Sequence, residues 1–265
     1  MTLLAAALLG IVQGITEFLP VSSTAHLLLV GEAIGHDDPG GVFTVMIQLG
    51  SIFAVVWLYR TKILKIVSEL RTSADARHFA AAIIIATIPA LAAGALLADY
   101  IQSVLYKSPR VFAFAFIGGG LVMLLVERFR PAPVVLDAER TPLGRALGVG
   151  LCQMLALVPG VSRSGATITL SMLLNVERAS AARFVFLMSL PAIIAAAAKE
   201  ALDLSEVGMA GLPVTLLAIG LVVSAVVGYI TVKFFVRYLA SHSLEVFAYY
   251  RFVLAAITVL WLWWR

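Results

Sequence analysis

The chain has 265 residues, of which 62% are hydrophobic and 13% charged, and its formal net charge is +4. Soluble domains use charged residues at about 25%, so this composition excludes an ordinary soluble domain and indicates a polytopic membrane protein. The basic residues form no continuous stripe, which excludes nucleic acid as an expected partner.

Apolar segments follow one another along the whole chain, and they are of two kinds. The first kind, at residues 10–30 and 147–174, is interrupted by a polar break that contains proline. Irregular backbone at membrane depth is tolerated only beside protein or a watery cavity, so both segments predict broken helices that line a site. The second kind is uninterrupted and predicts transmembrane helices. Its members are residues 42–59, 79–98, 111–126, 181–198, 214–235 and 246–264.

Charged residues in the connections predict the orientation. Basic residues gather after residues 42–59 and again after residues 111–126, whereas the segment before residue 42 carries acids such as Glu32 and Asp38 and no Lys or Arg. Basic loops are typically cytoplasmic. The first interrupted segment must then enter and leave from outside and the second from inside, so both are expected to be re-entrant hairpins.

The two halves of the chain resemble each other at an offset of about 140 residues, for example at Pro20-Val-Ser-Ser and Pro159-Gly-Val-Ser. Each half holds one hairpin and three spans, an odd number, so the halves must be inverted. We therefore predict a single integral membrane domain, residues 1–265, of the all-α polytopic class. Its inverted repeat consists of residues 1–130 and 140–265, approximately, each a re-entrant helical hairpin plus three transmembrane helices.

The first break begins with Gln13 and Glu17, which are four residues apart and share a helix face. Pro20 is expected to end this half-helix. A carboxylate in lipid must be paired or must bind something, so Glu17 is a candidate functional residue. With Gln13 or a phosphate oxygen it could hold a hard divalent cation, Mg²⁺ or Ca²⁺, through oxygen ligands.

Hydroxyl groups and a histidine follow. Ser22, Ser23 or Thr24 can cap the next half-helix, and His26 lies one turn after Ser22 and Ser23. His26 could deprotonate Ser23 or a water molecule, or protonate a leaving oxygen. The simpler interpretation is that the hydroxyls only cap the helix and that His26 binds a carbonyl group.

The second break places Arg163 among hydroxyls and glycines. An arginine at membrane depth costs roughly 2.5–3.5 kcal/mol on insertion scales and therefore indicates a function; its fork suits a phosphate. If the hairpins meet, two helix N-termini favour an anion in one cavity. Arg163 could instead form a structural ion pair with Glu17. The other candidate phosphate ligands here are Gly160, Ser162, Ser164, Gly165 and Thr167.

These residues support metal-assisted phosphoryl transfer. The alternative is a secondary transporter or flippase for a phosphorylated lipid or solute, because inverted repeats and half-helices near the midplane are typical of carriers as well. A carrier needs the arginine but no nucleophile, so Ser23 and His26 favour an enzyme.

The runs from Gln13 to His26 and from Pro159 to Gly165 closely resemble those of the bacterial undecaprenyl-diphosphate phosphatases, the bacitracin-resistance family. The resemblance covers nearly the whole chain. It implies a polyprenyl-diphosphate phosphatase of the inner membrane, dependent on a divalent cation, with an active site facing the periplasm or cell exterior. Its substrate would be a polyprenyl diphosphate lipid, and its product the carrier lipid for cell-wall synthesis.

By the same resemblance, Glu17 and Gln13 form the acidic motif, Ser23 is a candidate nucleophile with His26 as its proton partner, and Ser162, Arg163 and Thr167 bind the diphosphate. Many family members carry a second glutamate where this chain has Gln13. The resemblance leaves open whether Ser23 or water attacks, and whether the protein is a homodimer among the membrane lipids.

Overall fold

The structure is a computed structural model that describes residues 1–36, 38, 41–106, 108–207 and 213–263. These residues form helices, with one isolated β-bridge between Val135 and Val176, which confirms the all-α prediction for the described part of the chain. The helices are α1 (Leu3–Thr16), α2 (Ser23–Ala33), α3 (Val42–Leu58), α4 (Arg60–Glu69), α5 (Ala74–Tyr100), η2 (Ile101–Leu105), α6 (Pro109–Phe129), η3 (Ala138–Arg140), α7 (Leu143–Gln153), η4 (Met154–Leu157), α8 (Arg163–Leu173), α9 (Arg178–Val207), α10 (Val214–Leu239) and α11 (Glu245–Trp263).

Each uninterrupted apolar segment of the sequence forms one helix. Among the described residues, four stretches are long and apolar enough to cross a membrane, at 74–105, 110–129, 178–195 and 214–239. The chain is therefore a multi-pass membrane protein by the length and composition of its helices. Helix α11 begins one residue before the predicted span 246–264, whose residue 264 lies outside the described residues.

The sequence analysis did not predict a helix in the connection after the first uninterrupted segment. Helix α3 ends at Leu58, and the chain bends by 70° into the short helix α4. Leu64 and Val67 of α4 are exposed, whereas Ile63 and Ile66 pack against the core. An amphipathic helix of this kind needs tertiary contacts to form, which a count of basic residues in the connection does not reveal.

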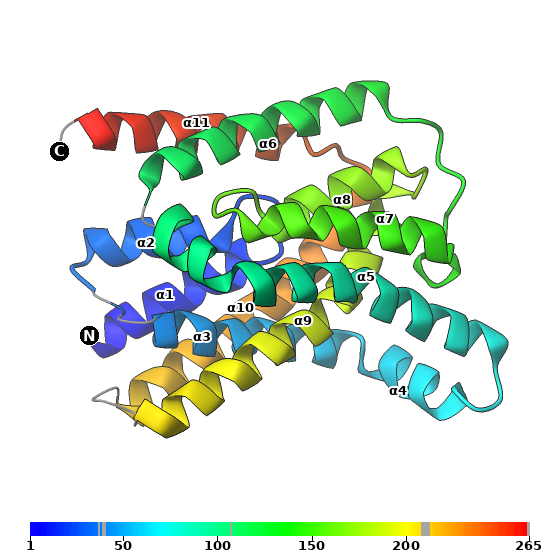
Figure 1. The fold of residues 1–265 in the computed structure, drawn as a ribbon, viewed down its shortest axis with the longest axis horizontal. Helices are drawn as coiled ribbons and strands as arrows, with labels where there is room; N and C mark the ends of the chain where they lie inside the picture. Colours follow the sequence, from blue (N-terminus) through cyan, green and yellow to red (C-terminus); the bar gives the residue numbers. More distant parts are fainter. Residues whose placement is uncertain (37, 39–40, 107, 208–212, 264–265) are drawn as a thin grey trace.

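The two halves exchange helices. Helix α1 packs against α10 of the second half, α7 packs against α5 of the first half, and α6 runs beside α11 (Figure 1). This reciprocal pairing is what two related halves would produce. Their inversion relative to a membrane remains a prediction.

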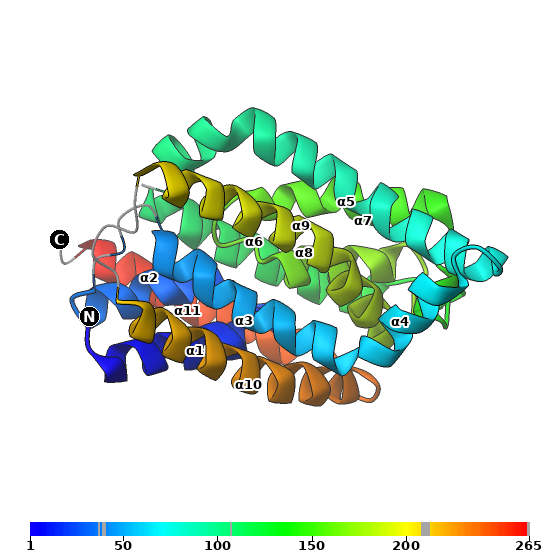
Figure 2. The ribbon, with the colours of Figure 1, turned by 90° about the horizontal axis from the view of Figure 1, so that it is seen from below.

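Glycines bring the site-bearing helices close to α10. A Cβ atom on Gly14 would lie 2.8 Å from the backbone nitrogen of Gly228, and one on Gly50 would overlap the carbonyl of Leu221. Small residues let helix backbones approach closely in membranes. Helices α1 and α3 therefore lie together along α10, as the view turned by 90° shows (Figure 2).

Both predicted breaks are confirmed. Helix α1 ends before Glu17 and α2 begins at Ser23, while η4 ends at Leu157 and α8 begins at Arg163. The residues that precede α2 and α8 are Ser22 and Ser162, whose φ angles are 73° and 70°. Positive φ is rare for residues other than glycine, so the two breaks share an unusual backbone conformation. They lie near each other in the middle of the molecule (Figure 1).

Candidate phosphate site

Two side-chain contacts join the breaks. The Ser164 hydroxyl donates to the Leu19 carbonyl at 3.0 Å, and Arg163 forms an ion pair with Glu17. Helix α8 therefore presents Arg163 to the end of α1, across 146 residues of sequence. The expected meeting of the two breaks is confirmed by these contacts.

The Glu17 carboxylate is the centre of the site. The residue is 7% exposed, and each of its two carboxylate oxygens accepts two hydrogen bonds. Oε1 accepts from Arg163 and from Gln48 Nε2 at 3.3 Å, and Oε2 accepts from Gln13 Nε2 at 3.0 Å and Ser23 Oγ at 2.7 Å. These four donors supply the pairing and the hydrogen bonds that a buried carboxylate needs.

The role of Gln13 differs from the expected one. Its amide nitrogen, and not its oxygen, faces Glu17, so the two side chains do not present a pair of oxygens to one cation. The described residues contain no group of three or more His, Cys, Asp or Glu side chains that could hold a metal ion together. A hard cation would therefore find one carboxylate here and would need phosphate oxygens or water as further ligands, which is how Mg²⁺ is commonly bound.

Ser23 and His26, the predicted nucleophile and proton partner, have different hydrogen-bond partners in the structure. Ser23 donates to Glu17, while His26 Nδ1 lies 2.7 Å from the Ser22 carbonyl and His26 Nε2 lies 2.7 Å from the Tyr250 hydroxyl. A carbonyl oxygen only accepts, so Nδ1 carries a proton, and in a neutral imidazole Nε2 then accepts from Tyr250. His26 thus reaches back one helical turn to Ser22.

Tyr250 of α11 is a site residue that the sequence analysis missed. If the chain releases phosphate as proposed below, Tyr250→Phe is expected to lower that activity by about 10-fold or more, because the imidazole of His26 loses the partner that orients it for the proton transfer expected of it. Tyr249→Phe removes the hydroxyl of the adjacent residue, which is 57% exposed, and is expected to keep full activity. Equal losses in both variants would contradict a role for Tyr250.

The two serines that precede the half-helices behave differently. Ser162 caps α8 as expected, because its Oγ accepts from the Gly165 backbone nitrogen at 3.2 Å. Ser22 precedes α2 but makes no capping hydrogen bond with its side chain. Thr24, in the first turn of α2, is half-buried and lies beside Tyr106.

Three other candidate phosphate ligands have mainly local contacts. The Thr167 hydroxyl, fully buried, donates to the Arg163 carbonyl at 2.6 Å in its own helix. A Cβ on Gly165 would lie 2.7 Å from Met123 Cε, so this glycine allows close packing. Gly160 has a φ of 93°, which favours glycine. Thr167 and Gly165 lie within α8, and the Thr167 hydroxyl donates to a carbonyl of that helix.

Arg251 of α11 is the second residue that the sequence analysis missed. Its side chain is completely buried and donates to carbonyl groups in both breaks and in α6. A signal was available, because Arg251 is a charged residue inside the apolar segment 246–264, and such a residue indicates a function or a specific partner.

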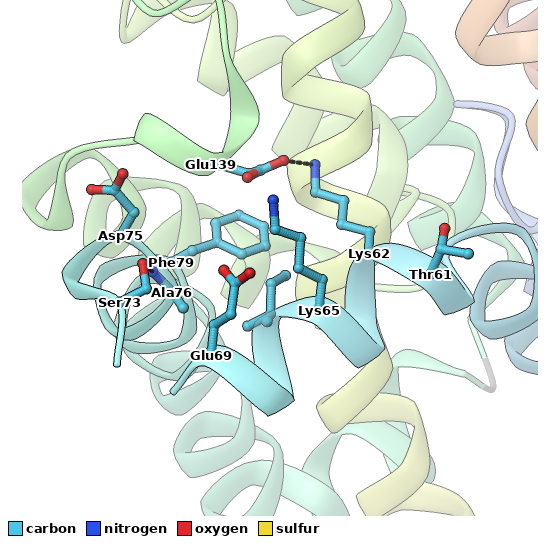
Figure 3. A pocket seen from close by; sticks show the side chains of 10 residues that line it. Thr61, Lys62, Lys65, Glu69, Ser73, Asp75, Ala76, Phe79 and Glu139 are labelled. Atoms are coloured by element: carbon cyan, nitrogen blue, oxygen red, sulfur yellow. Dashed lines mark hydrogen bonds and ion pairs between the residues drawn. The ribbon is translucent and has the colours of Figure 1, made fainter. Parts of the chain in front are cut away.

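A cavity of about 470 Å³ lies elsewhere, between α4, the start of α5 and η3 (Figure 3). Its lining includes Lys62 and Lys65 but also Glu69, Asp75 and Glu139, and Lys62 pairs with Glu139 at 2.5 Å. Carboxylates beside both lysines disfavour an anion. Neither Glu17 nor Arg163 lines this cavity, so we assign the chemistry to the meeting point of the breaks.

The chain is similar to known proteins over nearly its whole length. Residues 6–257 match the family model described as bacitracin resistance protein BacA. Proteins named undecaprenyl-diphosphatase are 41% identical in Phenylobacterium zucineum, over 96% of both chains, and 37% identical in Cereibacter sphaeroides, over 97% of this chain and 96% of the relative. One named undecaprenyl-diphosphatase 3, from Acinetobacter baylyi, is 41% identical over 95% of both chains. With a match over nearly its whole length, the chain belongs to the bacitracin resistance protein BacA family.

Proposed function

We propose that this chain hydrolyses undecaprenyl diphosphate to undecaprenyl phosphate and inorganic phosphate. The reaction would recycle the carrier lipid for cell-wall synthesis and confer bacitracin resistance. The relatives carry the name of this activity. One structural observation supports it most strongly: a serine hydroxyl and an arginine guanidinium share the same buried carboxylate where two half-helices meet.

The contacts of Glu17 suggest how the attacking oxygen is activated. Ser23 Oγ already donates to Glu17 Oε2 at 2.7 Å, so Glu17 can take the hydroxyl proton while Oγ bonds to the terminal phosphorus. The bond from that phosphorus to the bridging oxygen then breaks and undecaprenyl phosphate leaves. Water would afterwards hydrolyse the phosphoserine. A water molecule held by Glu17 and Ser23 could attack directly, with the same proton acceptor.

Arg163 would bind the non-bridging oxygens. Its side chain is 22% exposed, so it can exchange part of its contact with Glu17 for a diphosphate. A bidentate arginine is well suited to phosphate, and the N-termini of α2 and α8 add backbone N–H groups and positive dipole ends. Charge that develops in the transition state would thus meet fixed donors.

A divalent cation would fit this arrangement if Glu17 and the substrate bound it together. Glu17 would hold Mg²⁺ or Ca²⁺ together with diphosphate oxygens, and the cation would neutralise charge on the phosphates. Gln13 would then orient Glu17 through its amide nitrogen, as it does in the structure. Since one carboxylate is a weak site by itself, we expect the metal to bind tightly only when the substrate is present.

The long helices and the lipid substrate support a location in the bacterial inner membrane, with the active site open to the periplasm or the exterior. Keeping each CH₂ group in apolar surroundings is worth about 0.8 kcal/mol. The prenyl chain should therefore stay in the bilayer while only the diphosphate reaches Glu17 and Arg163.

Phosphate release by the purified protein tests the function. With Mg²⁺ or Ca²⁺, undecaprenyl diphosphate should yield phosphate, and EDTA should reduce the rate to background. Arg163→Ala should lower kcat/KM by about 10²–10³-fold, as expected for loss of a donor to developing charge. Arg128→Ala, which removes a charge at the end of α6, is a control that should retain full activity.

Absence of phosphate release with either metal would contradict the proposal and favour the carrier alternative. A carrier for a phosphorylated lipid would use Arg163 but has no use for a serine hydrogen-bonded to Glu17. The Ser23–Glu17 contact is therefore the observation that makes us prefer the enzyme.

A further inference from the structure

Arg251 joins the two breaks from behind the phosphate site. Its side chain has no exposed surface, and all five guanidinium N–H groups have carbonyl acceptors. The carbonyls, with the donor-to-acceptor distances, belong to Pro20 (3.3 Å), Gly160 (3.0 Å), Val161 (3.0 Å), Ala115 (2.7 Å) and Phe116 (3.4 Å). The ion pairs among the described residues are formed by side chains other than that of Arg251. The buried guanidinium of Arg251 thus donates hydrogen bonds to carbonyl groups of both breaks, in place of backbone N–H groups.

The direction of these carbonyls matters for the site. In a trans peptide the N–H group points opposite to the C=O group, and the described chain contains no cis peptide. Because the Val161 carbonyl points to Arg251, the N–H of Ser162 points to the opposite side, at the N-terminus of α8. The fork of Arg251 therefore holds this end of α8 in the orientation that suits an anion.

We infer that Arg251 is a positioning residue of the phosphate site: its guanidinium ties the carbonyls of Pro20 and of Gly160–Val161 together, and so holds Glu17 and Ser23 in register with Arg163. This role rests on the proposed function. A lysine would keep the charge but lose the planar fork, because an ammonium is a point charge on a flexible stem.

Helix α6 is shaped around this guanidinium. A Cβ atom on Gly119 would overlap the guanidinium of Arg251, whereas one on the neighbouring Gly118 would meet nothing within 4 Å. The chain therefore offers a way to displace Arg251 without changing it, with a matched control one residue away.

The test measures kcat and KM for phosphate release in Arg251→Lys and Gly119→Ala, per folded molecule. We expect kcat to fall about 10²-fold in both, as misplacement by about 1 Å does, with KM changed by less than about threefold. Gly118→Ala should match wild type. Arg178→Lys, which changes another arginine that is mostly buried and pairs with Glu127, should also match wild type.

A purely structural role predicts something else. Both Arg251→Lys and Gly119→Ala would then lower the yield of folded protein, while the folded molecules of both variants would keep the kcat of wild type. That result would overturn the inference.

Amide hydrogen exchange gives a second readout that does not depend on activity. In Arg251→Lys, exchange in residues 17–24 and 158–164 should accelerate together by at least about 10-fold, since both segments lose a common anchor. Acceleration in neither segment, or in only one, would contradict the inference. If wild type released no phosphate, the proposed function would fail while this comparison would still test whether Arg251 joins the breaks.

Discussion

Glu17→Gln is expected to lower kcat for phosphate release by about 10²–10⁴-fold, the range for losing a general base. The change keeps the shape of the side chain but removes the charge that accepts from Arg163 and Ser23. It also leaves Arg163 without its carboxylate. We expect phosphate release to be lost. Without a divalent cation, the binding of an uncleaved diphosphate analogue should be largely kept, because Arg163 would then be free to pair with the phosphate oxygens.

Glu127→Gln is the matched control. Glu127 is also a buried carboxylate, with 4% of its side chain exposed, and it pairs with Arg178 away from the site. Its neutralisation should affect stability but leave kcat per folded molecule unchanged. If Glu17→Gln kept a kcat within threefold of wild type, Glu17 would not be the proton acceptor.

Ser23→Ala is expected to have the largest effect if serine is the nucleophile, with kcat reduced by at least about 10⁴-fold. Acid-quenched wild-type enzyme should then contain phosphate on Ser23, detectable by mass spectrometry. Ser189→Ala is a suitable control, because that buried hydroxyl donates to the Phe186 carbonyl of its own helix.

The opposite outcome has a clear meaning. A Ser23→Ala enzyme that stays within about tenfold of wild type, while Arg163→Ala is inactive, would make water the attacking group. Ser23 would then serve to orient that water beside Glu17. No phosphoserine should accumulate in that case.

Much of the fold could be predicted because membrane helices have a strong local signal. The apolar segments and both breaks follow from hydrophobic runs, prolines and isolated polar residues, and irregular backbone at membrane depth must be protected. Helix α4 could not be predicted this way. Its short amphipathic pattern is stabilised by packing on the core and by the 70° bend after α3.

Part of the candidate site could likewise be predicted from the sequence, and part could not. Glu17 and Arg163 stand out in the sequence because each is a charge in an apolar segment, and their meeting follows from the similarity of the two breaks. The partners of Ser23 and His26 did not follow. The sequence places these residues one turn apart, yet Glu17 lies beside the serine and Tyr250 beside the histidine.

The sequence by itself therefore determined the membrane class, the two broken segments and the charged residues whose burial in a bilayer is costly. These properties depend on local hydrophobicity and on the cost of burying a charge. The tertiary structure alone decided which donors surround Glu17 and that Arg251 anchors both breaks. Those contacts join α1, α3, α8 and α11, and side-chain geometry across distant helices leaves no pattern in the spacing of residues along the chain.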